Sequence, residues 1–253
     1  MTIDPVTLAR PTLDASMLNP PILDPLVMLP GMMCDDRLFA PQVEAFSSDR
    51  QVIIPALSGA ETITDLARLL LTQLPGRFAL AGLSMGGIVA MEMMRQAPSR
   101  ISRLALLDTN PFAEDKDRQA IRDQQMAKVQ NGALQAVMRD DMKPHYLAAS
   151  QNRQQVVDLC MEMALDLGAA VFIDQSKALA SRPDQAAHLP KITVPCLVLY
   201  GAEDRLCPAD RHDAMHDLIP TSKLVKIEGA GHLPCLEQPE QTTAALQRWL
   251  EEQ

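Results

Sequence analysis

Short runs of apolar residues, each ended by proline, glycine or charged residues, recur along most of the chain. Runs of this length that are apolar throughout are typical of strands buried on both faces of a parallel sheet. They predict strands over residues 26–29, 51–55, 78–81, 104–107, 194–200 and 223–227.

Between these runs, the spacing of apolar residues changes to the helical period. Apolar side chains at positions 63, 66, 69, 70 and 74 predict an amphipathic helix over 63–74. The same reading predicts helices over 85–96, 208–218 and 239–250. Strands that alternate with helices predict an α/β fold with a mostly parallel central sheet flanked by helices.

Residues 111–190 depart from this alternation, because they contain helical patterns over 118–129, 134–142 and 154–167 but no clear strand. We therefore expect an all-helical lid inserted into a core formed by residues 26–110 and 191–253. Residues 1–25 carry five prolines, which disfavour helices and sheet ladders. They predict a proline-rich arm on the surface.

Charge and cysteine content narrow the class of protein. A net charge of −9 argues against nucleic acid as a partner, because phosphate binding needs a basic face. Five widely spaced cysteines predict neither a disulfide framework nor a zinc site, and they favour a reducing compartment. With no signal-peptide pattern and no apolar stretch of roughly 18 residues, we expect a cytoplasmic protein without a membrane span.

A candidate catalytic motif occurs at Gly82-Leu83-Ser84-Met85-Gly86. It matches the pattern G-x-S-x-G and lies between a predicted strand and a predicted helix. In that context, the pattern predicts a nucleophile elbow, a tight turn that exposes the hydroxyl of Ser84. The simpler interpretation is a glycine-rich turn with a capping serine.

A serine hydroxyl needs a base, and a base needs an acid that orients it. His232 follows the last predicted strand in a glycine-rich loop, and Asp204 follows the strand that ends at Tyr200. Both would lie with Ser84 at the carboxyl edge of the sheet. Glu203 and Asp108 compete for the role of acid, and we interpret Asp108 as a turn or cap residue.

The other histidines are assigned structural or solvent-exposed positions. His212 and His216 lie four residues apart on a predicted helix without an evident third metal ligand, so we expect both to be solvated and predict no metal site. His145 and His188 belong to the lid region, where His145 is a candidate to line the pocket.

A tetrahedral intermediate needs two donors for its oxyanion. We expect them to be the backbone N–H groups of Met85, which follows the serine, and of Met32, in the loop after the first strand. The neighbouring side chains of Met33 and Leu233 are candidates for an apolar pocket.

Three segments in this order, G-L-S-M-G-G, Y-G-A-E-D-R and G-A-G-H-L-P, resemble the signatures of the α/β-hydrolase superfamily. The resemblance covers the chain from about Leu26 to its end, and is greatest to lid-bearing carboxylesterases and enol-lactonases. The chain departs from many relatives by having Pro30-Gly31 where they have His-Gly. It also has the proline-rich arm in place of an initial antiparallel strand pair, so we expect six or seven strands with the arm covering the edge.

The resemblance implies a serine hydrolase that cleaves a small or medium ester or lactone through an acyl-enzyme, with no cofactor. Two alternatives stay open. The same triad can act on a peptide, a thioester or a C–C bond, and the fold can also serve a ligand-binding receptor without catalysis.

Overall fold

Six parallel strands form one sheet in the computed structural model, which describes residues 23–142, 146–150 and 152–252. The strands are β1 (Leu26–Leu29), β2 (Val52–Ile53), β3 (Phe78–Leu83), β4 (Ile101–Leu107), β5 (Cys196–Gly201) and β6 (Ser222–Ile227). Their order is β2-β1-β3-β4-β5-β6, and every neighbouring pair is parallel. The predicted mostly parallel sheet is confirmed.

The strands are apolar throughout because their side chains alternate between two separate cores. In β1, Val27 and Leu29 belong to one apolar cluster, whereas Leu26 and Met28 belong to the other. All four side chains are fully buried. A strand that faces water on neither side has no polar alternation, which is the pattern seen in the sequence.

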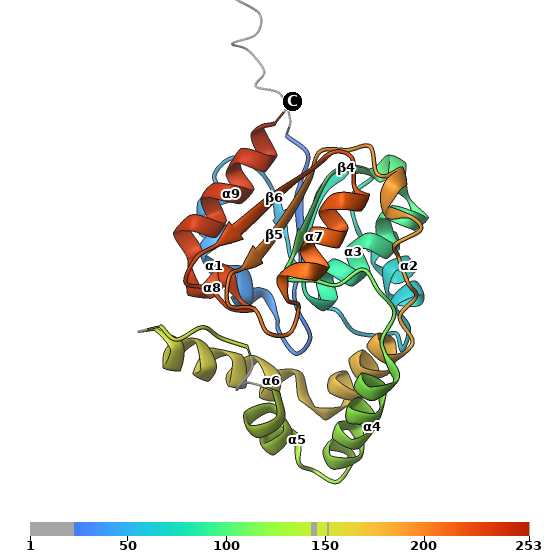
Figure 1. Ribbon diagram of the computed structural model, residues 1–253, viewed down its shortest axis with the longest axis vertical. Coiled ribbons are helices and arrows are strands. Elements are labelled where there is room, and N and C mark those ends of the chain that lie inside the picture. Colours follow the sequence, from blue (N-terminus) through green and yellow to red (C-terminus); the bar gives the residue numbers. More distant parts are fainter. Residues whose placement is uncertain (1–22, 143–145, 151, 253) are drawn as a thin grey trace, which may run out of the picture.

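Helices cover both faces of the sheet (Figure 1). One face carries α2 (Ile63–Gln73), α3 (Met85–Gln96) and α7 (Ala209–Leu218). The other carries α1 (Ala40–Phe46), α8 (Pro234–Glu237) and α9 (Pro239–Glu251). Short 3-10 turns span Asp36–Phe39, Pro98–Arg100 and Leu189–Lys191. The result is a three-layer α/β arrangement.

A helical region, which we call the lid after its predicted role, lies between β4 and β5 in the chain and extends beyond one end of the sheet (Figure 1). It contains α4 (Lys116–Gln130), α5 (Leu134–Ala136), a π-helical stretch (Val137–Met142) and α6 (Arg153–Ala180). Gly168 interrupts α6 with φ 79° and ψ 177°. The part of α6 before this break matches the predicted helix over 154–167, and a second helical part follows the break and ends at Ala180.

The first part of the chain differs from its prediction at the second strand. The second strand is shorter than the predicted 51–55, because only Val52 and Ile53 pair with β1 at this edge of the sheet. Residues 1–22 of the proline-rich arm lie outside the described residues, as does its predicted cover of the sheet edge. Within the described part of the chain, no helix is both long and apolar enough to span a membrane.

At the end of β5, Gly201 packs closely against the loop that follows β6. A Cβ at Gly201 would overlap the carbonyl of Gly231 and lie 2.6 Å from that of Ala230. Gly201→Ala should therefore lower the free energy of unfolding by about 1–3 kcal/mol. Gly76, with no atom within 4 Å of its Cβ position, is the matched control, and Gly76→Ala should change stability by less than about 1 kcal/mol. Urea unfolding of both variants measures this, and equal effects would contradict it.

Candidate active site

The site begins at the turn from β3 into α3. Ser84 occupies this turn with φ 55° and ψ −115°, a backbone conformation that residues other than glycine rarely adopt. A Cβ on Gly82 would overlap the carbonyl of Gly86, and a Cβ on Gly86 would overlap that of Leu29. Because only glycine fits at both positions, the backbone can turn sharply and present the hydroxyl of Ser84 at the carboxyl edge of the sheet.

The adjacent strand β4 and the loop after it fix this turn. The N–H of Ser84 donates to the carbonyl of Leu107 at 2.9 Å. The Thr109 hydroxyl donates to the carbonyl of Ser84 at 2.7 Å. A Cβ on Gly87 would lie 2.6 Å from the side chain of Thr109. Close packing on this side thus holds Ser84 in its strained conformation.

His232 approaches Ser84 from the loop after β6. Its Nε2 lies 2.9 Å from the Ser84 hydroxyl oxygen, although the two residues are far apart in the sequence. The His232 backbone N–H donates to the carbonyl of Tyr146 at 2.6 Å, and the two rings meet edge to face. With its side chain only 4% exposed, the imidazole is fixed in place and shielded from water.

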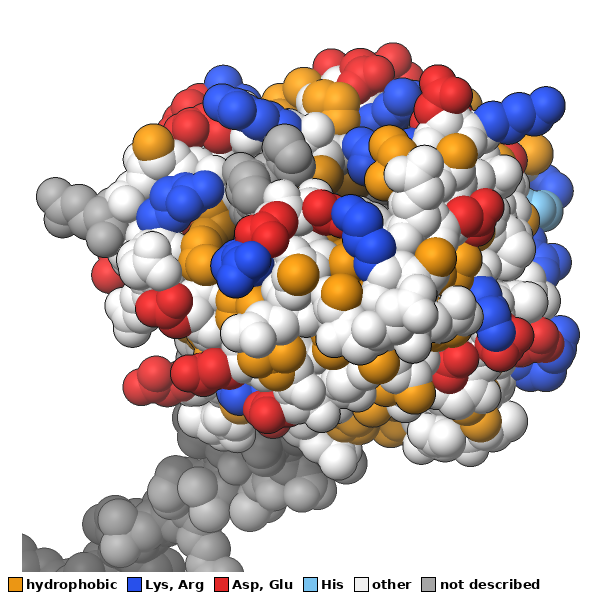
Figure 2. Space-filling view, turned by 90° about the horizontal axis from the view of Figure 1, so that it is seen from below, with side chains coloured by type: hydrophobic (Ala, Val, Ile, Leu, Met, Phe, Trp, Pro, Cys, Tyr) orange, Lys and Arg blue, Asp and Glu red, His pale blue; other side chains and the backbone are white. Residues whose placement is uncertain are grey.

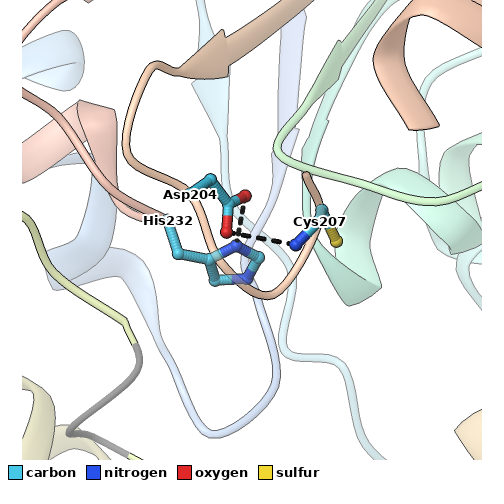
Figure 3. Close-up of side chains that lie close together, drawn as sticks. All are labelled: Asp204, Cys207 and His232. Carbon is cyan, nitrogen blue, oxygen red and sulfur yellow. Dashed lines mark hydrogen bonds and ion pairs between the residues drawn. The ribbon is translucent and has the colours of Figure 1, made fainter. Parts of the chain in front are cut away.

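Asp204 is hydrogen-bonded both to His232 and to the backbone of the loop that follows Asp204 (Figure 3). Its Oδ2 lies 2.8 Å from Nδ1 of His232, and its Oδ1 accepts from the backbone N–H groups of Leu206 and Cys207 at 2.8 and 3.1 Å. Burial raises the pKa of Asp204, but the charge of His232 and these hydrogen bonds lower it more, so that the pKa is below its ordinary value. The carboxylate therefore stays ionised.

The two competing acids occupy different environments. Glu203 is exposed. Asp108 is fully buried, and its Oδ1 accepts from the N–H of Gly201 at 2.8 Å. Burial, followed by the negative charge of Asp204, raises the pKa of Asp108 well above its ordinary value. Asp204, rather than either competitor, is hydrogen-bonded to His232.

Asp204, Cys207 and His232 also present three potential metal-ligand atoms within 4.8 Å of one another. Both ring nitrogens of His232 are already engaged, with Asp204 and with Ser84. Burial raises the pKa of the Cys207 thiol well above its ordinary value, which disfavours the thiolate that a metal would require. The geometry therefore favours a hydrogen-bonded triad over a metal centre.

Glu237 organises the loop that carries His232 and is a residue that the sequence analysis missed. Its carboxylate accepts from the N–H groups of Gly231 and Leu233, each at 3.0 Å, on either side of the histidine. It also accepts from the N–H of Ala148 in the lid at 2.8 Å. Burial raises the pKa of Glu237, although these backbone hydrogen bonds oppose the shift. One buried carboxylate thus joins the histidine loop to the lid.

The predicted oxyanion donors lie on two adjoining segments. Met85 is the first residue of α3, so its N–H has no acceptor within the helix. The loop that contains Met32 is braced from the lid, because the N–H of Met33 donates to Oε1 of Gln175 at 2.8 Å. Nε2 of Gln175 in turn donates to the carbonyl of Leu57 at 2.9 Å. This contact could not be predicted from the sequence, because Gln175 is distant in the chain from both Met33 and Leu57.

A cavity of about 550 Å³ opens over these groups. Its lining includes four of the predicted site residues, Met32, Ser84, Met85 and His232. Met33 and Leu233, the predicted pocket side chains, are buried at 0% and 1% exposure and lie outside this lining. Ile88, Tyr146 and Leu179 supply apolar wall in their place.

The prediction that His212 is solvated is wrong. The N–H of Thr109 donates to its Nε2 at 3.2 Å, and its ring stacks on Tyr200 with the centroids 4.7 Å apart. The side chain is fully buried, and desolvation lowers its pKa to about 4. His212 therefore supports the loop of Thr109, which in turn holds the Ser84 turn.

Of the other three histidines of the chain, the two that the structure describes have different surroundings from those of His212 and His232. His216 is half-buried, with its Nδ1 2.8 Å from the hydroxyl of Ser222. His188 is half-buried after α6. His145 lies outside the described residues, so its predicted place in the pocket stays a prediction.

Comparison with known proteins agrees with this architecture. The model of the alpha/beta hydrolase family matches residues 26–246. A thermophilic esterase from Thermogutta terrifontis superposes with a TM-score of 0.83 at 29% identity, covering 89% of each chain.

Two curated relatives are similar in sequence. A pimeloyl-[acyl-carrier protein] methyl ester esterase from Pectobacterium atrosepticum is 28% identical over 73% of this chain and 74% of its own length. A biotin biosynthesis bifunctional protein from Teredinibacter turnerae is 25% identical over 90% of this chain. The chain spans only 45% of that bifunctional protein.

The pKa of His212 yields a prediction for stability. Between pH 6.5 and about 4, the unfolded chain takes up a proton at this imidazole and the folded protein does not. The free energy of unfolding should therefore fall as the pH falls through this window, by about 3 kcal/mol from this group. Urea unfolding across the window should show a smaller loss of stability for His212→Gln than for the wild-type protein. Identical curves for wild type and His212→Gln would contradict this.

Proposed function

The chain belongs to the alpha/beta hydrolase family, and we propose that it is a serine esterase with Ser84 as nucleophile, His232 as base and Asp204 as orienting acid. The observation that carries the proposal is the chain of hydrogen bonds from Ser84 to His232, at 2.9 Å, and from His232 to Asp204, at 2.8 Å. Its position in the wall of a cavity gives a substrate access to the hydroxyl. The names of the relatives support an ester as the substrate class.

In the first half of the reaction, Nε2 of His232 accepts the hydroxyl proton as Oγ of Ser84 attacks the ester carbonyl. Ionised Asp204 stabilises the imidazolium that forms and keeps the proton on Nδ1. The tetrahedral intermediate collapses, its C–O bond breaks, and the leaving alkoxide takes the proton from Nε2. An alcohol and an acyl-enzyme result.

In the second half, water gives a proton to Nε2 of His232 and attacks the acyl carbonyl. Collapse releases the carboxylic acid and returns the proton to Ser84. In both halves, the N–H groups of Met32 and Met85 would stabilise the oxyanion, each by about 3–4 kcal/mol. No step requires a metal ion or an organic cofactor.

The cavity supports a small or medium ester or lactone as substrate. A volume of about 550 Å³ lies within the range typical of small-molecule sites. We assign residues 26–110 and 191–253 to the catalytic core and residues 111–190 to the lid. Lid residues such as Tyr146 and Leu179 form part of the cavity wall, so the lid would select among acyl groups.

Removing the hydroxyl of Ser84 tests the nucleophile. Ser84→Ala should lower kcat/KM for p-nitrophenyl butyrate by roughly 10⁴- to 10⁶-fold, because the acyl-enzyme of the proposed reaction forms on this hydroxyl. Ser181→Ala, at the exposed end of α6, should retain wild-type activity. Comparable hydrolysis by the folded Ser84→Ala variant would contradict the assignment.

Replacing each of the two buried aspartates, Asp204 and Asp108, by asparagine distinguishes their roles. Asp204→Asn should lower kcat roughly 10⁴-fold, because an amide favours the wrong imidazole tautomer. Asp108→Asn should change kcat by less than about 10-fold, because His232 is hydrogen-bonded to Asp204 and the amide oxygen of an asparagine at position 108 can still accept from the N–H of Gly201. Steady-state rates on p-nitrophenyl butyrate compare the variants. A larger loss for Asp108→Asn would exchange the two roles.

A further inference from the structure

Three charged side chains form a cluster in the wall of the cavity: Glu114, Arg122 and Arg182. Arg122 donates to both oxygens of Glu114, at 2.9 and 3.1 Å, and Nη1 of Arg182 lies 3.0 Å from Oε1 of the same carboxylate. The three side chains are only 3%, 13% and 8% exposed, respectively. This is a built ionic cluster rather than a set of solvated surface charges.

The cluster joins the lid to the active site. Glu114 precedes α4, Arg122 lies on α4, and Arg182 follows α6. Nη1 of Arg122 also lies 3.6 Å from Sδ of Met32, whose N–H is a proposed oxyanion donor. The guanidinium of Arg122 therefore lies beside the loop that would receive the ester carbonyl.

The charges of the cluster do not balance. Two guanidinium groups share one carboxylate, which leaves one positive charge in excess. Burial lowers the pKa of Arg182, although the charge of Glu114 opposes this shift. A buried charge is costly unless a partner compensates it. The cluster is therefore incomplete by one negative charge on the side that faces the cavity.

The charged side chains in the rest of the cavity wall also carry a net positive charge. Among the described residues, five arginines and three carboxylates line the cavity, a surplus of two positive charges in a protein of net charge −9. By contrast, basic and acidic side chains are interspersed on the outer face seen from the lid side (Figure 2). The positive character thus belongs to the cavity and not to that face as a whole.

We propose that Arg122 and Arg182 form a subsite for a carboxylate, so that the substrate is an ester that carries a second, ionised carboxyl group. This inference rests on the proposed esterase function and deepens it. A guanidinium pairs well with a carboxylate because its donors match the two oxygens. The substrate carboxylate would supply the charge that the cluster lacks.

A purely structural role for the cluster makes a different prediction. One arginine would suffice to pair with Glu114 and tie the lid to the core. In that case, the second arginine would affect stability and the hydrolysis of all esters alike. A carboxylate subsite instead changes the ratio of kcat/KM between charged and neutral esters.

Wild-type protein gives the first test, with matched pairs of esters. Monomethyl glutarate against methyl pentanoate places the charge on the acyl side, and 4-acetoxybenzoate against phenyl acetate places it on the alcohol side. We expect at least one charged ester to exceed its neutral partner in kcat/KM by about 10- to 100-fold. Glutarate should also inhibit phenyl acetate hydrolysis competitively, and glutaramide should not.

Two variants with a matched control locate the subsite. Arg122→Gln removes the surplus charge and leaves Glu114 paired with Arg182, so the charged-to-neutral ratio should fall toward unity. Glu114→Gln removes the negative charge, so the ratio should rise. Arg139→Gln makes the same change in net charge at an exposed lid residue outside the cavity lining and should leave the ratio unchanged.

The outcomes separate the two proposals. Hydrolysis of neutral esters that depends on Ser84, with no preference for either charged ester and no inhibition by glutarate, would overturn the subsite alone. A preference that Arg122→Gln leaves intact would also overturn it. Absence of hydrolysis for every ester would instead remove the proposed esterase function.

Discussion

The site depends on close backbone packing around the turn from β3 into α3. Gly82 allows the end of β3 to approach the carbonyl of Gly86, and Gly86 allows α3 to begin against the carbonyl of Leu29 at the end of β1. Two consequences follow from this packing. Ser84 is held at a positive φ with its hydroxyl exposed, and Met85 and Met32, the proposed oxyanion donors, are brought onto adjoining segments.

Three loops at the carboxyl edge of the sheet then meet around this turn. Thr109 binds the carbonyl of Ser84, and buried His212 binds the N–H of Thr109. Glu237 fixes the loop of His232 and connects it to the lid. Each support satisfies a buried polar group that would otherwise be costly, so fold stability and site geometry rest on the same hydrogen bonds.

Local patterns were enough to predict the parallel sheet and the helical region between β4 and β5, and they also supplied the hypothesis of a triad. The strands could be predicted because they are apolar on both faces. The three motifs could be recognised because each follows a predicted strand. The residues that hold the site in place, Gln175, His212 and Glu237, could not be predicted. They bind backbone groups, several of which are distant in the sequence. Sequence position likewise gave no means of pairing Glu114 with Arg122 and Arg182, which only the packing of the lid brings together.

The central claim is that Ser84 is an activated nucleophile. Labelling with a fluorophosphonate tests it most directly, because the phosphonyl adduct does not turn over and its position can be mapped by peptide mass spectrometry. The account predicts one adduct per chain, on Ser84, and labelling that is far slower in His232→Gln. A folded protein that hydrolyses esters but carries no adduct, or carries it on another residue, would contradict the account.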